Sequence, residues 1–191
     1  MDGQARQAPR KYPLAMRLLH WLRAALILGL IASGWYMTSF PEQATPPVIY
    51  EVFYPNHTQF GVLVWLLAVL HLAIRWRNRA ALPQTPDLLK PWEKMLSHFV
   101  HRAIIALTLA VPLLGYAMSS SFTQSDGVPF FGFGMLPELL PKNDRAFAVF
   151  GALHAYGAFT LLGLVALHVA GTVKHRLHDK GGETDVLPRM L

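Results

Sequence analysis

Residues 152–170 read ALHAYGAFTLLGLVALHVA, within a stretch that has no charged side chain from Phe147 to Val173. Its two histidines, His154 and His168, are fourteen positions apart. In an α-helix, fourteen residues turn through about 1400°, roughly 40° short of four turns, so both imidazoles lie on one face. They are about 21 Å apart along the axis, so a helix crossing a bilayer about 30 Å thick holds one near each side. We predict that this helix carries one axial ligand for each of two haems.

The composition favours a small polytopic membrane protein. The chain has 191 residues, 53% of them hydrophobic, and a positive mean hydropathy, which is unusual for a soluble domain. It has no cysteine, which excludes disulfides, iron–sulfur clusters and covalent haem attachment. Haem must then be b-type, held by histidine or methionine. The net charge of +6 does not indicate nucleic acid as a partner, because the basic residues gather beside the apolar segments.

The apolar segments predict an all-α fold, an integral membrane four-helix bundle that binds two b-type haems. We expect one domain over residues 1–191, with membrane spans at about 16–40, 57–76, 95–118 and 146–173. Residues 127–141 are too interrupted by glycine and proline to close their own hydrogen bonds in lipid. Residues 1–15 are polar and basic, and we expect them to be mobile, with no cleavable signal peptide.

The distribution of lysine and arginine predicts the orientation. Fifteen of these residues lie in or beside the N-terminal segment, the second loop and the C-terminal tail, and two lie in the other loops. Cytoplasmic loops of membrane proteins carry the excess of positive charge. We therefore expect both termini in the cytoplasm and membrane lipid around the helices.

Position along each predicted helix then gives the depth of each histidine. His20 and His168 lie near the cytoplasmic ends of their helices, whereas His57 and His154 lie near the periplasmic ends. We predict that these two pairs are the axial ligands of two haem irons, for which imidazole is a suitable donor. Six-coordinate iron has no open position, which suits electron transfer across the membrane.

Other residues are candidates for contacts with the haems. His71 follows His57 by fourteen residues, so it is an alternative to His20 as the partner of His168, although we favour a hydrogen bond to a haem propionate. His98 and His101 are spaced as neighbours on one helix face; a metal site is one reading, and a propionate or proton-relay role is preferred. Four arginines are expected to anchor the helices on the cytoplasmic side, with one or two also pairing with propionates: Arg17, Arg23, Arg75 and Arg77.

At this point the chain resembles the bacterial cytochrome b561 family, four-helix di-haem membrane cytochromes that include the superoxide oxidase type. The resemblance covers about residues 12–191. Each motif is weak alone, but their order is specific: RLLHWL at 17–22, HTQFG at 57–61, HFVH at 98–101, PLLG at 112–115, PFFGFG at 129–134, LHVA at 167–170, KH at 174–175 and VLPRML at 186–191.

The resemblance implies haem ligation by the same four histidines and electron exchange with ubiquinone. For the superoxide oxidase type it also implies superoxide as the donor at the periplasmic face. Lys142 and Arg145 are the two basic residues on that face, and we expect them to steer the anion toward the haem. His175, beside Lys174 at the cytoplasmic end of the last span, is the candidate proton donor to the quinone, with His98 and His101 behind it.

Two other classes of protein fit the same segments. A haem b anchor subunit would pass electrons between quinone and a partner oxidoreductase, and it would co-purify with that protein electron donor. A membrane scaffold without redox function would purify colourless. The sequence favours the superoxide:ubiquinone oxidoreductase over both.

Overall fold

The computed structural model describes residues 11–125, 127–180 and 182–191. The described part contains four long helices, α1 (Leu14–Met37), α2 (Tyr54–Arg77), α3 (Pro91–Ser121) and α4 (Asp144–His178). All four are long and apolar enough to cross a membrane, which confirms the predicted all-α four-helix membrane bundle. The segment before residue 11, expected to be mobile, lies outside the described residues.

Shorter elements fill the connections. They are two 3-10 turns, η1 (Glu42–Ala44) and η3 (Arg79–Ala81), a π-helical turn η2 (Ile49–Phe53) that leads into α2, and the C-terminal 3-10 turn η4 (Leu187–Arg189). Between α3 and α4, β1 (Val128–Pro129) pairs antiparallel with β2 (Met135–Leu136) to form a small hairpin.

Local side-chain chemistry sets the helix ends. α1 ends at Met37, before residue 40, because the hydroxyls of Thr38 and Ser39 donate to the carbonyls of Gly34 and Trp35. α4 begins where the Asn143 side chain accepts from the Ala146 amide at 3.0 Å, an N-cap of the usual kind. α3 begins at a proline, and its third residue, Glu93, accepts from the Lys90 amide at 3.0 Å.

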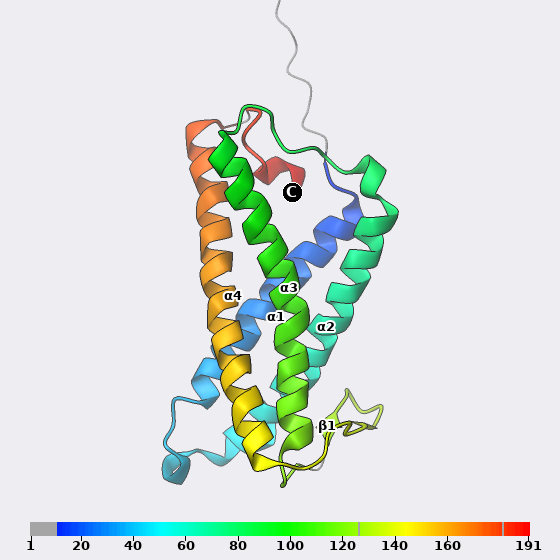
Figure 1. Cartoon of the computed structure of the whole chain (residues 1–191), viewed down its shortest axis with the longest axis vertical. Helices are drawn as coiled ribbons and strands as arrows, with labels where there is room; N and C mark the ends of the chain where they lie inside the picture. Colours follow the sequence, from blue (N-terminus) through cyan, green and yellow to red (C-terminus); the bar gives the residue numbers. More distant parts are fainter. Residues whose placement is uncertain (1–10, 126, 181) are drawn as a thin grey trace, which may run out of the picture.

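Figure 1 shows α3 and α4 side by side, with α2 beside α3 and α1 crossing behind them. Small residues let α3 and α4 approach closely. A Cβ added to Gly157 would lie 2.9 Å from a methyl of Val111, and one added to Gly151 would lie 3.2 Å from the Met118 sulfur. Close backbone approach at glycine is typical of helix packing inside membranes.

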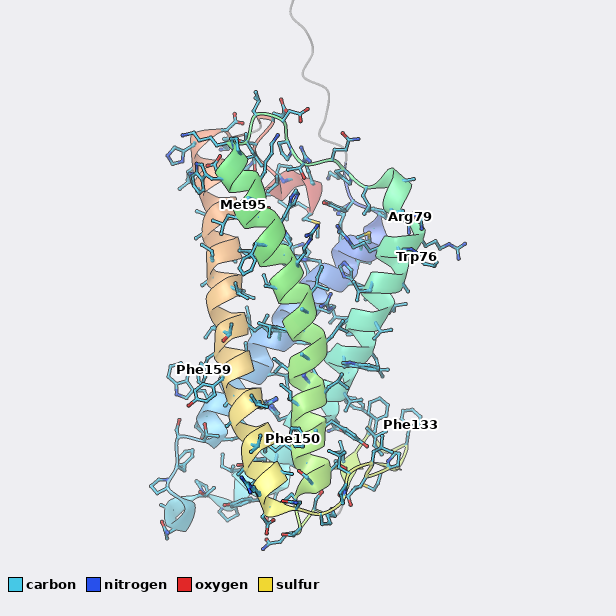
Figure 2. The ribbon with its side chains drawn as sticks, viewed as in Figure 1. Trp76, Arg79, Met95, Phe133, Phe150 and Phe159 are labelled. Atoms are coloured by element: carbon cyan, nitrogen blue, oxygen red, sulfur yellow. The ribbon has the colours of Figure 1, made fainter. Side chains whose placement is uncertain are left out.

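Much of the outer surface is apolar. Large hydrophobic side chains on every long helix are exposed, with Trp76 at 72% and Leu177 at 75%, and Figure 2 shows Trp76 and Phe159 pointing away from the bundle. A contiguous exposed surface of this kind on four long helices is the surface that lipid covers. The protein is therefore in contact with membrane lipid.

Both described chain ends lie at one end of the bundle, which we call the terminal end (Figure 1). There the Tyr12 amide donates to the Arg189 carbonyl at 3.0 Å, and the Trp21 indole donates to the Met190 carbonyl at 2.9 Å. Arg176 pairs with the buried Asp185 at 2.6 Å. These contacts fold the C-terminal tail over the bundle. The opposite end carries the β1–β2 hairpin, and we call it the hairpin end.

Candidate functional site

At the hairpin end, His57 of α2 faces His154 of α4. Their ring centroids are 6.0 Å apart, with an interplanar angle of 76°. His57 lies in the first turn of α2, whereas His154 lies about three turns into α4. The first three turns of α4 therefore extend beyond this histidine pair at the hairpin end. The two histidines that the sequence paired at this level therefore face each other.

Hydrogen bonds fix the tautomer of both rings at the hairpin end. The Nδ1 of His154 lies 2.9 Å from the Val111 carbonyl, which only accepts, so this nitrogen carries the proton. The Nδ1 of His57 lies 3.1 Å from the Ser33 hydroxyl, which itself donates to the Leu30 carbonyl. His57 is then also protonated at Nδ1. Both Nε2 lone pairs are left to bind a metal, the arrangement that orients histidine ligands in metalloproteins.

Glycines form the surfaces against which these two rings lie. A Cβ added to Gly115 of α3 would lie 2.9 Å from both Cε1 and Nδ1 of His154. One added to Gly34 of α1 would lie 3.2 Å from Cε1 of His57. A side chain at either glycine would therefore crowd the imidazole, so both positions need glycine for the rings to lie where they do.

At the terminal end, His20 of α1 faces His168 of α4. Their ring centroids are 6.3 Å apart and the interplanar angle is 64°. His101 of α3 is closer to His168, with a centroid distance of 4.9 Å and an interplanar angle of 84°. His71 of α2 makes no ring contact with His168 within the described part of the chain, but it lies within electrostatic range of His20 and Arg23.

The spacing of the rings provides a test of whether iron fits between them. A first-row metal ion binds an imidazole nitrogen at about 2 Å, and hence lies about 3 Å from the ring centroid. Half of the 6.0 Å and 6.3 Å centroid distances is 3.0 Å and 3.15 Å. Both predicted pairs thus have the centroid spacing expected of two imidazoles that share one ion. His101 and His168, at 4.9 Å, are in direct contact and leave no such space.

Buried nitrogen atoms without a hydrogen-bond partner gather at the terminal end. Within the described residues they include the Nε atoms of Arg17, Arg23 and Arg189 and the Nδ1 of His71. Buried donors normally have partners, and arginine donors match carboxylate oxygens. These atoms therefore fit the propionates of a haem at this level, which is the role that the sequence predicted for Arg17 and His71.

The two histidines predicted to act together on α3 are separated by the fold. His101 points toward His168 and its Nδ1 lies 2.6 Å from the Ser97 carbonyl, whereas the Nε2 of His98 lies 3.2 Å from the Thr85 hydroxyl in the preceding loop. In residues 11–125, 127–180 and 182–191, no three histidine, aspartate or glutamate side chains gather as a metal-binding group. His98 is thus remote from the ring cluster.

Lys142, Arg145 and His175 lie at the two ends of the bundle. Lys142 forms a 2.6 Å ion pair with Glu138 and donates to the Ser125 carbonyl. Its hydrogen bond holds the pKa of the Glu138 carboxyl below its ordinary value. Arg145, in the first turn of α4, is exposed and makes no ion pair with any residue that the structure describes. His175 is half-buried next to Lys174, which pairs with Glu93 at 2.6 Å.

The hairpin adds contacts that the sequence analysis did not anticipate. The Phe131 amide donates to the Gln59 side chain at 2.9 Å, and the Phe131 ring lies 5.1 Å from that of Phe60. Phe131 has a positive φ of 45°, which is strained for a bulky residue. Gln59 and Phe60 follow His57 directly, so the hairpin is attached to the helix turn that carries this histidine.

The described residues thus form a membrane protein of four long apolar helices, with two opposed imidazole pairs of a kind suited to hold haem inside the bundle. A family profile described as prokaryotic cytochrome b561 matches residues 11–191. The chain belongs to the prokaryotic cytochrome b561 family. It is 27% identical over 187 residues to cytochrome b561 homolog 2 of Escherichia coli (strain K12), covering 96% of this chain and 92% of that protein. It is 26% identical over 168 residues to cytochrome b561 homolog 1 of the same organism, covering 85% and 88%.

Membership in the family confirms the coarser part of the sequence prediction. The chain is a multi-pass bacterial membrane protein whose function is transmembrane electron transfer through haem b.

Proposed function

We propose that the chain is a superoxide:ubiquinone oxidoreductase of the bacterial inner membrane, with two b haems between His57 and His154 and between His20 and His168. One observation supports the two haem sites: two opposed imidazole pairs lie at two levels of one bundle, with the centroid spacing of ligands that share an ion. Superoxide and ubiquinone as substrates are what the resemblance to the superoxide oxidase type implies. Because the two α4 histidines are fourteen residues apart, the levels are about 21 Å apart along that helix.

The orientation follows from the charge distribution. Lysine and arginine are concentrated at the terminal end, and cytoplasmic loops carry such an excess. We place the terminal end in the cytoplasm and the hairpin end in the periplasm. The His57–His154 pair then lies on the side where periplasmic superoxide arrives, and the His20–His168 pair lies on the cytoplasmic side.

Haem held by these two histidine pairs would supply one-electron chemistry. The overall reaction balances when two superoxide anions each give up one electron, forming two molecules of O₂. One ubiquinone accepts the two electrons and two protons and becomes ubiquinol. The protein's own groups guide the anion at the periplasmic end and supply protons at the cytoplasmic end.

At the periplasmic end, Arg145 is the stronger candidate for steering superoxide. Glu138 is held in its charged form by Lys142, so the two charges largely cancel toward an approaching anion. Arg145 is exposed and has no acidic partner within the described part of the chain. A single exposed charge changes the encounter rate modestly and in a salt-dependent way.

At the cytoplasmic end, His175 is the candidate proton donor. It follows His168 by seven residues, two helical turns, and so lies on nearly the same face of α4. Glu93 lies within electrostatic range of it and is itself bound to Lys174. This group of titratable side chains at the membrane boundary offers a route for protons from the cytoplasm to a reduced quinone.

The proposal is tested with the haem-loaded protein in detergent. We expect a burst of superoxide, delivered with catalase present, to reduce the haem within the mixing time, and added ubiquinone to reoxidise it. Haem that superoxide does not reduce would contradict the proposal. It would favour the anchor-subunit alternative, in which a protein donor supplies the electrons.

The role of the periplasmic charges predicts a difference between two variants. At low salt we expect Arg145→Gln to lower the second-order rate of haem reduction by superoxide about two- to fivefold, because one unpaired charge is lost. Lys142→Gln should change it less, since Glu138 already offsets that charge. The difference should shrink above about 0.5 M salt, where the Debye length falls to a few ångströms. Equal rates for Arg145→Gln and the native protein at low salt would rule out steering by this residue.

A further inference from the structure

A groove of about 660 Å³ runs along one face of α3 toward the terminal end. Its lining combines apolar side chains with two basic ones: Met95, His98, Phe99, Arg102, Ala103 and Ala106. The residues recur at intervals of three and four, so they form one continuous strip of the helix surface. None of them is an acidic residue, and none belongs to the four proposed haem ligands.

The groove faces away from the haem sites. The His101 ring contacts that of His168, and at about 100° per residue Phe99 and Arg102 lie about 160° and 100° away from His101 around the helix. Met95 is 71% exposed and Phe99 is 63% exposed, and Figure 2 shows Met95 on the part of α3 nearest the terminal end. This strip of α3 is open to the surrounding membrane.

Arg102 lies in the half of α3 that is nearer the terminal end. α3 has 31 residues and is therefore about 46 Å long, about 16 Å longer than the hydrocarbon layer is thick. Arg102 follows Pro91, the first residue of α3, by eleven residues, a rise of about 16 Å. Ala103 and Ala106 continue the strip toward the middle of α3, and Met95 and His98 lie nearer the terminal end.

The positive charge of Arg102 has no compensation in the described part of the protein. No ion pair or hydrogen bond joins its guanidinium to another described side chain. His98 is held beside it by the contact between its Nε2 and the Thr85 hydroxyl. A charged side chain facing a membrane is costly unless it finds a partner, and a guanidinium binds phosphate oxygens with two parallel hydrogen bonds.

We infer that this α3 groove binds an anionic phospholipid. The phosphate is bound by Arg102 and His98, and an acyl chain lies along Phe99, Ala103 and Ala106, where small residues leave room for it. Basic pockets beside membrane helices are suited to such head groups. A neutral quinone ring would fill the apolar part of the groove but would leave the arginine charge without a counter-ion. The inference holds for either orientation of the protein and does not depend on the proposed reaction.

Native mass spectrometry of the haem-loaded protein tests this inference. The protein is equilibrated in micelles with equal amounts of phosphatidylglycerol and phosphatidylcholine, and the lipids retained per chain are counted. We expect retention of phosphatidylglycerol over phosphatidylcholine, and about a tenfold loss of phosphatidylglycerol affinity in Arg102→Gln. The matched control is Arg77→Gln, an exposed arginine of the same end that does not line the groove, and it should retain the lipid.

A second variant keeps the charge and fills the apolar part of the groove. Ala106→Phe should also lower phosphatidylglycerol retention, and the haem absorption bands of both variants should match those of the native protein, which shows that the bundle is intact. Equal retention of both lipids by the native protein would overturn the inference. So would an equal loss in Arg77→Gln, or displacement of phosphatidylglycerol by added ubiquinone.

Discussion

Replacing His154 by alanine is expected to leave one haem b per chain where the native protein holds two, and replacing His168 should have the same result. Each variant removes one of the two imidazoles that face each other across a single site, while the other site is about 21 Å away along α4. The second site does not depend on the lost ring, and the glycine contacts between α3 and α4 at Gly151 and Gly157 remain. The pyridine haemochrome assay on purified protein gives the ratio of haem to chain.

Two further variants decide between His20 and His71 at the terminal end. His20→Ala should lose this haem, because the His20 ring is spaced for iron opposite His168. His71→Ala should keep it, with a shifted reduction potential if a propionate loses a hydrogen bond. His178→Ala is the control, since its Nδ1 is bound to the Lys174 carbonyl at the end of α4. Loss of haem in His71→Ala with retention in His20→Ala would reverse the assignment.

Replacing Gly115 by alanine is expected to weaken haem binding at the hairpin end without touching a ligand. The new methyl group would lie 2.9 Å from two atoms of the His154 ring, closer than such atoms approach. The ring cannot move freely, because its Nδ1 is bound to the Val111 carbonyl at 2.9 Å. Displacing a group that orients a metal ligand costs about 10- to 100-fold in affinity. A titration of the apo-protein with haem measures this change.

Gly163→Ala is the matched control for Gly115→Ala. Both substitutions place alanine in the interior of a long apolar helix, which favours the helix slightly, but a Cβ at Gly163 meets no atom within 4 Å. We expect this variant to bind both haems as the native protein does. If Gly115→Ala also bound both haems with native affinity, the placement of the His154 ring against this glycine would be wrong.

The sequence was sufficient to predict the fold and the opposed histidine pairs. In lipid, an apolar segment of membrane length can pair its own backbone N–H and C=O groups only as a helix. The fourteen-residue spacing of His154 and His168 then places two histidines at two depths on one helix. His20 and His57 could then be paired by depth alone, which requires no knowledge of crossing angles. The structure brings both pairs together.

Contacts that depend on the rotation of one helix against another could not be predicted. His98 and His101 are neighbours on α3, yet His101 contacts His168 and His98 contacts the loop at Thr85. Likewise, Gly115 lies against the His154 ring of another helix, a contact that its place in the PLLG motif does not reveal. The hydrogen bond between the His57 ring and the Ser33 hydroxyl is a third such contact, because it joins α2 to α1. A single sequence contains no signal for such rotations.

The most direct test of the account is low-temperature electron paramagnetic resonance of the oxidised native protein, combined with its haem content. We predict two haems per chain, both low-spin, because each iron has two imidazole ligands and no open position. A single haem per chain, or a high-spin signal from a five-coordinate iron accounting for half of the haem, would contradict the assignment of paired histidines at two levels.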